Sequence, residues 1–230
     1  MVIGFSNRAK QILQTVWSEP RDRALHLLLV FFGAAAILML VQRFDLFSAP
    51  AGVRMFFLQS VLVVLLIYLA LKGWRPILRT ERNWFLGIIA LYLAGLFLLD
   101  RLAALDIEVA YRPLELPAWD QLLLGLVLAP ILEELFFRDY LFRVLSSQGM
   151  KWSFALLLSA AFFTLAHFSL YPGAFFLGLL NGILYIASGG VLLPIAFHLV
   201  CNLSWYLLPA FYPSLFYLLE HSNLREIFYR

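Results

Sequence analysis

Seven apolar runs dominate the chain, each close to the length that a helix needs to cross a lipid bilayer. A membrane-spanning helix takes about 20 mostly apolar residues. In lipid the backbone must satisfy its own hydrogen bonds, and the runs lack the alternating pattern of barrel strands. We therefore predict an all-α, polytopic membrane helix bundle with about seven transmembrane helices, within a range of six to eight, at residues 24–41, 55–71, 84–99, 117–145, 152–171, 173–187 and 191–208.

The composition agrees with a membrane protein. Of the 230 residues 63% are hydrophobic and 13% charged, and the mean hydropathy is +0.87, outside the range of soluble domains. No tandem repeat or long linker divides the chain. We expect one integral membrane domain over residues 1–230, with N-terminal helices in 1–116 and a motif-bearing core in 117–208.

The basic residues indicate an orientation. On alternate sides of seven spans, eleven of the 17 Lys and Arg fall on the side of the N-terminus and six on the other. The positive-inside rule then places the N-terminus in the cytoplasm. The net charge is only +3, and the basic residues lie at helix ends, where anionic lipid headgroups explain them. No nucleic-acid partner is therefore expected. The compact length favours a bacterial inner membrane protein.

Several polar residues interrupt the apolar runs. An ionisable group at membrane depth costs about 2.5 to 3.5 kcal/mol on insertion scales, so each one calls for a partner or a function. These groups lie on four predicted helices: Glu133 with Glu134, His167, His198 with Asn202, and Asn181 between Gly178 and Gly182. The two glycines are expected to serve packing within the chain rather than dimerisation, and the oligomeric state is left open.

The spacing of the charged residues separates the two glutamates. Glu134 and Arg138 are four residues apart, which predicts an ion pair on one helix face. Glu133 is rotated by about 100° from that pair and has no counter-ion nearby in the sequence. The alternative is that Glu133 reaches toward the headgroups, which leaves the second carboxylate without a purpose.

These side chains together are suited to amide hydrolysis. A carboxylate in a low-dielectric site becomes a better general base. A histidine beside it can help to position a water, and His198 with Asn202, again four residues apart, can donate hydrogen bonds to an oxyanion. The expected partners are the lipid bilayer and a membrane-bound or lipid-anchored protein or peptide substrate.

Three short motifs in order resemble those of the CPBP intramembrane protease family, which includes the CAAX prenyl endopeptidases and bacterial abortive-infection relatives. They are EELFFR at residues 133–138, an aromatic residue shortly before a histidine (Phe163 and His167), and His198 followed four residues later by Asn202. The resemblance covers about residues 117–208. Where the family commonly has a small residue after the motif arginine, this chain has Asp139.

The resemblance implies a role for each motif residue. Glu133 would activate water with His167, Glu134 and Arg138 would form a supporting pair, and His198 with Asn202 would form the oxyanion site. A metal-free mechanism without a cofactor is favoured because the zincin spacing H-E-x-x-H is absent. Zinc held by the two histidines and a glutamate is the alternative.

Other functions are weaker alternatives. A thiol mechanism would use Cys201, and a rhomboid-like serine mechanism would use Ser188, yet both leave the paired glutamates unexplained. Ser188 in IASGG is more simply a helix end followed by a turn. A proton-coupled transporter or a non-proteolytic immunity or scaffold protein could also hold polar groups in the membrane.

Overall fold

The computed structural model describes residues 51–71, 73–78, 82–105, 122–147, 149–167 and 172–221. Every regular element within these ranges is a helix, so the all-α prediction is confirmed for this part of the chain. The predicted first span at 24–41 lies outside the described residues. The later predicted spans each coincide with helices, which are α3 (Ala51–Leu71), α4 (Arg82–Ala103), a long helix from η1 to α7, α8 (Trp152–Ala166), α9 (Pro172–Ser188) and α10 (Leu192–Phe211).

The long helix is continuous but not uniform. It consists of the π-helix η1 (Leu123–Leu128), α6 (Ala129–Glu134), the π-helix η2 (Leu135–Phe142) and α7 (Arg143–Ser147). Pro130 near the start of α6 lacks an N–H, and in a regular α-helix its ring would clash with the carbonyl four residues earlier. The wider turns of η1 accommodate it. This helix continues to Ser147, well past Arg138, so its α6 part contacts α10 and its η2 part contacts α8.

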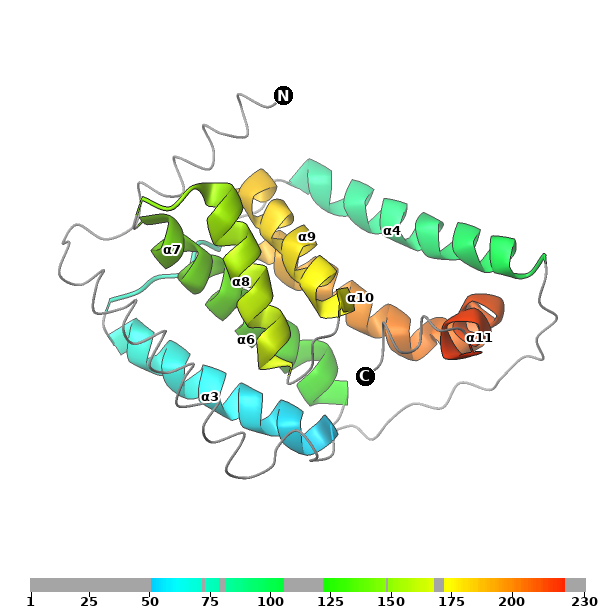
Figure 1. The fold of residues 1–230 in the computed structure, drawn as a ribbon, viewed down its shortest axis with the longest axis horizontal. Coiled ribbons are helices and arrows are strands. Elements are labelled where there is room, and N and C mark those ends of the chain that lie inside the picture. Colours follow the sequence, from blue (N-terminus) through cyan, green and yellow to red (C-terminus); the bar gives the residue numbers. More distant parts are fainter. Residues whose placement is uncertain are drawn as a thin grey trace.

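The long helix lies among three others. Its α6 part contacts α3 on one side and α10 on another, while η2 contacts α8 and α9 (Figure 1). Helices α8 and α9 pack closely because α9 presents two glycines to α8. A Cβ on Gly178 would lie 3.2 Å from the Cα of Ala160, and one on Gly182 would lie 2.1 Å from Leu156 Cδ1. The glycine pair thus serves packing within the chain, as predicted.

The C-terminal part packs against α4. The carboxylate of Asp100, near the end of α4, accepts hydrogen bonds of 3.0 Å from the backbone N–H groups of Ser214 and Leu215. These N–H groups belong to the first turn of α11 (Pro213–His221), where backbone donors have no partner within the helix. Asp100 therefore caps α11 from another element.

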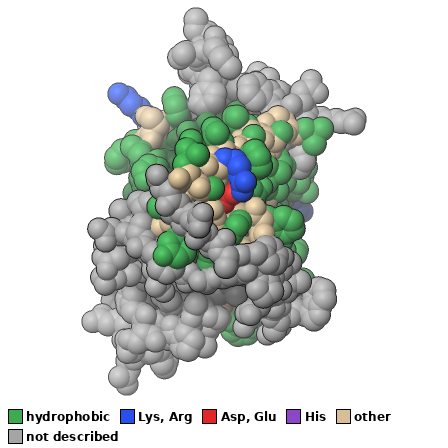
Figure 2. Space-filling view, turned by 90° about the vertical axis from the view of Figure 1, so that its right-hand side faces the viewer, with side chains coloured by type: hydrophobic (Ala, Val, Ile, Leu, Met, Phe, Trp, Pro, Cys, Tyr) green, Lys and Arg blue, Asp and Glu red, His purple; other side chains and the backbone are tan. Residues whose placement is uncertain are grey.

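Apolar side chains cover much of the outside. Among the described residues two helices are long and apolar enough to cross a membrane, Leu86–Ala103 and Leu192–Phe211, and three shorter helices are also apolar. Large hydrophobic side chains such as Val64 and Leu71 are mostly exposed. Figure 2 shows a face on which hydrophobic side chains surround a small group of charged ones. Such a surface is suited to contact with lipid. The number of seven spans remains a prediction.

Candidate active site

A buried ion pair organises the polar core. Glu134 at the end of α6 and Arg138 in η2 are 0% and 1% exposed, and Arg138 Nε lies 3.0 Å from Glu134 Oε2. The pair predicted from their spacing is therefore confirmed. The Arg138 guanidinium also stacks over the ring of Phe163 from α8, 4.2 Å from its centroid, which adds a cation–π contact.

Glu134 has two further partners from other helices. Its Oε1 accepts a hydrogen bond of 2.8 Å from His198 Nδ1 of α10 and another of 2.8 Å from Asn181 Nδ2 of α9. The polar character of Asn181 between two glycines is visible in the sequence, but its partner is not, because it lies 47 residues away. One carboxylate thus joins the long helix to α9 and α10.

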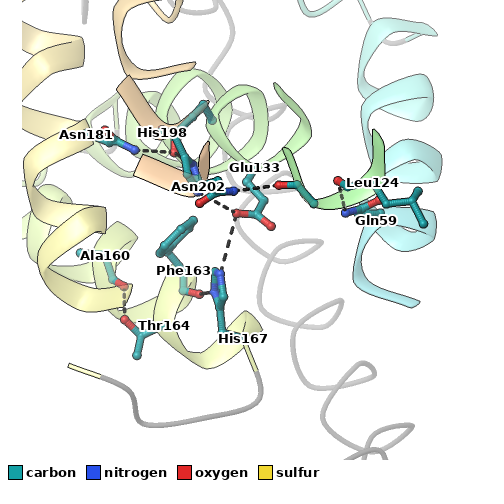
Figure 3. A network of polar contacts seen from close by, with 12 residues as sticks. Gln59, Leu124, Glu133, Ala160, Phe163, Thr164, His167, Asn181, His198 and Asn202 are labelled. Carbon is teal, nitrogen blue, oxygen red and sulfur yellow. Dashed lines mark hydrogen bonds and ion pairs between the residues drawn. The ribbon is translucent and has the colours of Figure 1, made fainter. Parts of the chain in front are cut away.

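The neighbouring carboxylate of Glu133 is buried without such support. Its Oε2 lies 3.9 Å from His167 Nε2 and 4.0 Å from His198 Nε2 (Figure 3). Glu133 is 4% exposed, and its Oε2 has no hydrogen-bond partner among the described residues. The two histidines come from the end of α8 and the middle of α10. The structure therefore brings together the two predicted histidines and the glutamate that was expected to lack a local counter-ion.

Hydrogen bonds determine which nitrogen of each histidine carries a proton. His167 Nδ1 lies 2.7 Å from the carbonyl oxygen of Phe163, which can only accept, so Nδ1 is the donor. His198 Nδ1 donates to the Glu134 carboxylate. In the neutral ring the remaining Nε2 has a free lone pair. In their neutral forms both rings therefore present Nε2 to Glu133 as an acceptor.

Asn202 lies one turn after His198 on α10, as the spacing predicts. Its Nδ2 donates a hydrogen bond of 2.8 Å to the carbonyl oxygen of Gly125 in η1. The side chain is half-buried and sits beside the cluster of Glu133 and the two histidines in Figure 3. Both predicted motif residues of α10 therefore contact the long helix.

The contacts of Asp139 account for a carboxylate at the position where the family commonly has a small residue. It is fully buried and accepts hydrogen bonds from Tyr185 Oη (2.9 Å), the backbone N–H of Ile77 (3.0 Å) and Arg143 Nη1 (2.8 Å). These contacts join η2 to α9, α7 and the segment that follows α3. Sequence reasoning did not find this cluster, although the spacing of Asp139 and Arg143 repeats that of Glu134 and Arg138.

The two known separations in this cluster are wider than those between ligand atoms of a bound zinc ion. Ligand atoms of a tetrahedral zinc ion with bonds of about 2.1 Å lie about 3.4 Å apart. The separations from Glu133 Oε2 to the two Nε2 atoms, 3.9 and 4.0 Å, are wider. No group of three or more His, Cys, Asp and Glu side chains in the described part of the chain is placed to hold a metal ion.

The two alternative nucleophiles, Cys201 and Ser188, each make contacts that give them a structural role. Cys201 packs against the buried apolar cluster of Leu184, Leu193 and Phe197. Ser188 is the last residue of α9, and its hydroxyl donates to the carbonyl of Gly190 at 2.9 Å. Gly189 follows with φ +76°, a conformation that glycine adopts readily. The helix end and turn predicted for this segment are confirmed.

Comparisons with known proteins agree with the motifs. Residues 115–204 match the family described as "Type II CAAX prenyl endopeptidase Rce1-like". An uncharacterized 24.3 kDa protein of Escherichia coli is 29% identical over 207 residues, covering 79% of this chain and 94% of that protein. No solved structure matches significantly. Residues 115–204, which hold Glu133, Glu134, His167 and His198, thus match the Rce1-like CAAX prenyl endopeptidase family, in agreement with the resemblance of the motifs to the CPBP family.

Proposed function

We propose that the protein is an intramembrane endopeptidase that cleaves a peptide bond of a membrane-associated or lipid-anchored protein or peptide with a glutamate-activated water. The observation that carries this proposal is the approach of two histidine nitrogens to Glu133 Oε2, His167 Nε2 at 3.9 Å and His198 Nε2 at 4.0 Å. The buried Oε2 of Glu133 lacks a hydrogen-bond partner in the described structure, as expected of a base that acts on a third molecule.

The distances are suited to a bridging water. A water with hydrogen bonds of about 2.8 Å to two groups spans a separation of about 4 Å at a bond angle near 90°. Glu133 would take one proton from this water while His167 Nε2 accepts the other in a hydrogen bond. The hydroxide attacks the carbonyl carbon of the substrate. When the tetrahedral intermediate collapses, the C–N bond breaks and Glu133 returns the proton to the leaving amine.

His198 and Asn202 are the proposed stabilisers of the oxyanion. Gly125 accepts one N–H of the Asn202 amide, and the amide has a second one to offer. His198 can donate from Nε2 only when the ring is doubly protonated, because Nδ1 already donates to Glu134. A carboxylate on the far side of the ring stabilises such an imidazolium, as in Ser-His-Asp triads. Glu134 would therefore act through His198 rather than on the substrate.

The location and partners follow from the same features. The apolar exterior and the family match support a membrane location. The similarity to an Escherichia coli protein supports a bacterial membrane, for which we propose the inner one. The distribution of Lys and Arg supports a cytoplasmic N-terminus. The substrate would reach the site from lipid or through a narrow polar opening.

Cleavage of two defined probes tests the proposal. Purified protein in liposomes is incubated with a farnesylated peptide ending in a CAAX sequence and with a single-span peptide that has no lipid. The variants are Glu133→Gln and, as a matched control on α11, Glu220→Gln. Cleavage by wild type and control but not by Glu133→Gln supports the mechanism, and the probe that is cut identifies the substrate class.

The same assay examines metal dependence. We expect activity to be unchanged by a strong chelator. Loss of cleavage with chelator and recovery with zinc would make Glu133, His167 and His198 metal-site candidates. Equal cleavage by wild type and Glu133→Gln would refute the catalytic assignment, and no cleavage of either probe would favour a non-proteolytic role.

A further inference from the structure

The helix that holds Glu133 contains a break in its backbone hydrogen bonding. In η1 the N–H of Ala129 donates to the carbonyl of Leu124, five residues earlier. The next bond in this register would run from residue 130 to the carbonyl of Gly125, but Pro130 has no N–H. In a membrane an unsatisfied backbone carbonyl is costly, so another donor is needed.

Two amide side chains donate to carbonyls here, one to Gly125, which lacks its backbone donor, and one to Leu124, which also accepts from the N–H of Ala129. Asn202 Nδ2 of α10 donates to the Gly125 carbonyl at 2.8 Å. Gln59 Nε2 of α3 donates to the adjacent carbonyl of Leu124 at 3.0 Å (Figure 3). We call these four residues the amide clamp. Its two donors come from opposite neighbours of the long helix, and α3 lies outside the residues that match the family.

Gln59 is placed for this contact by the fold of α3. It is 4% exposed and lies on the buried face of the helix with Leu62, Leu66 and Leu69. Its Oε1 is buried without a hydrogen-bond partner in the described structure, so the side chain is held in place by its N–H alone. A buried amide whose oxygen lacks a partner calls for an explanation, which the contact of its N–H with Leu124 offers.

The clamp lies close to the reacting groups. Gly125 and Glu133 are eight positions apart, about 12 Å along a helix with a rise of 1.5 Å per residue. On the other side of Glu133, Ser159 Oγ of α8 donates to the carbonyl of Phe137 at 2.7 Å. The segment that carries Glu133 is thus held from α3, α8 and α10, the last two of which also contribute the histidines.

We propose that the amide clamp sets the position of Glu133 relative to His167 and His198, and that Gln59 is a positioning residue for the proposed hydrolysis. This inference rests on the proposed function for its effect on catalysis. Without the Gln59 donor the turns of η1 can change their hydrogen-bond register. Such a change rotates and shifts the next part of the long helix, which carries Glu133. A displacement of about 1 Å at a reacting group can reduce the rate by about a hundredfold.

Three variants and a control test the role of Gln59. Gln59→Met keeps the size of the side chain and removes the donor, whereas Gln59→His keeps a donor of similar reach. Ser60→Ala is the control, because Ser60 is exposed and its hydroxyl bonds only within α3, to Phe56. Pro130→Ala restores an N–H for the Gly125 carbonyl and should let η1 relax towards an α-helix.

The assay uses whichever probe wild type cuts, with kcat and KM measured separately. For Gln59→Met we expect kcat to fall about 10- to 100-fold with little change in KM, as for a displaced base. Gln59→His should retain most of kcat, and Ser60→Ala all of it. Pro130→Ala should lower kcat without lowering the melting temperature, which a purely structural role of the proline would not do.

A second measurement does not depend on activity. Amide hydrogen exchange in residues 122–134 should be faster in Gln59→Met than in wild type and unchanged in Ser60→Ala. If wild type cuts its probe while Gln59→Met shows normal kcat and normal exchange, the clamp is refuted and the proposed function stands. If wild type cuts neither probe, the proposed function fails, and the exchange rates alone decide whether Gln59 holds the helix.

Discussion

The same substitution at the two adjacent glutamates should have different effects on the stability of the protein. Glu134 contacts Arg138 at 3.0 Å and accepts hydrogen bonds of 2.8 Å from His198 and Asn181, and it is fully buried. Glu133 is almost as buried, but its nearest charged or titratable partners lie at 3.9 and 4.0 Å. Replacing either carboxylate by an amide removes one negative charge without changing the size of the side chain.

The structure sets the size of each effect. In Glu134→Gln the buried Arg138 loses its counter-ion, which typically costs about 3 to 5 kcal/mol. For a chain of this size that corresponds to a fall in melting temperature of about 6 to 20 °C. In Glu133→Gln a poorly compensated charge disappears from a site where insertion of a charge costs about 2.5 to 3.5 kcal/mol. Its melting temperature should therefore stay the same or rise.

Thermal unfolding of both variants in one detergent, combined with the cleavage assay, checks this prediction. Cleavage should be lost in both, because Glu133→Gln removes the base and Glu134→Gln removes the partner of His198. Only Glu134→Gln should also lose stability, and Glu220→Gln should behave like wild type. A Glu133→Gln protein that melts as early as Glu134→Gln would show that Glu133 is also part of a stabilising pair, and the reasoning would be wrong.

Three further predictions concern stability and the alternative nucleophile. Asp139→Ala leaves Arg143 buried without its carboxylate, so unfolding should become easier by about 3 to 5 kcal/mol, and the additional change Arg143→Leu should restore most of the loss. Gly178→Ala brings a Cβ within 3.2 Å of the backbone of α8 and should cost about 1 to 3 kcal/mol in thermal unfolding. Gly87→Ala, where a Cβ meets nothing within 4 Å, should not destabilise the protein. Cys201→Ala should retain cleavage activity, and loss of activity would revive the thiol mechanism.

Much of the fold was predictable because lipid leaves few choices. The length and apolar character of the runs indicate helices, and their positions from residue 55 onward agree with the structure. The helix ends agree less well. Helix α8 ends at Ala166 although the apolar run continues to residue 171, and the helix of Glu133 continues to Ser147. Hydropathy shows which segments of the chain can lie in lipid, whereas the ends of a helix depend on backbone hydrogen bonding.

Local spacing also determined part of the site. Two residues four apart share a helix face, so the pairing of Glu134 with Arg138 and the common direction of His198 and Asn202 follow from the sequence alone. The cost of a charge in the membrane marks Glu133 as the residue that needs an explanation. Gln59 gave only a weak signal, a single uncharged amide in an apolar run.

Only the tertiary structure decided which groups meet. Glu134 joins partners 47 and 64 residues away in the sequence, and Gln59 reaches a carbonyl 65 residues away. Such contacts depend on how helices rotate and pack, which close approach at Gly178 and the widened turns before Pro130 help to set. The sequence by itself determined the helices and the polar groups within them. The orientation of the histidine rings, the role of Asp139 and the amide clamp needed the packed bundle, because each arises from contacts between helices rather than within one.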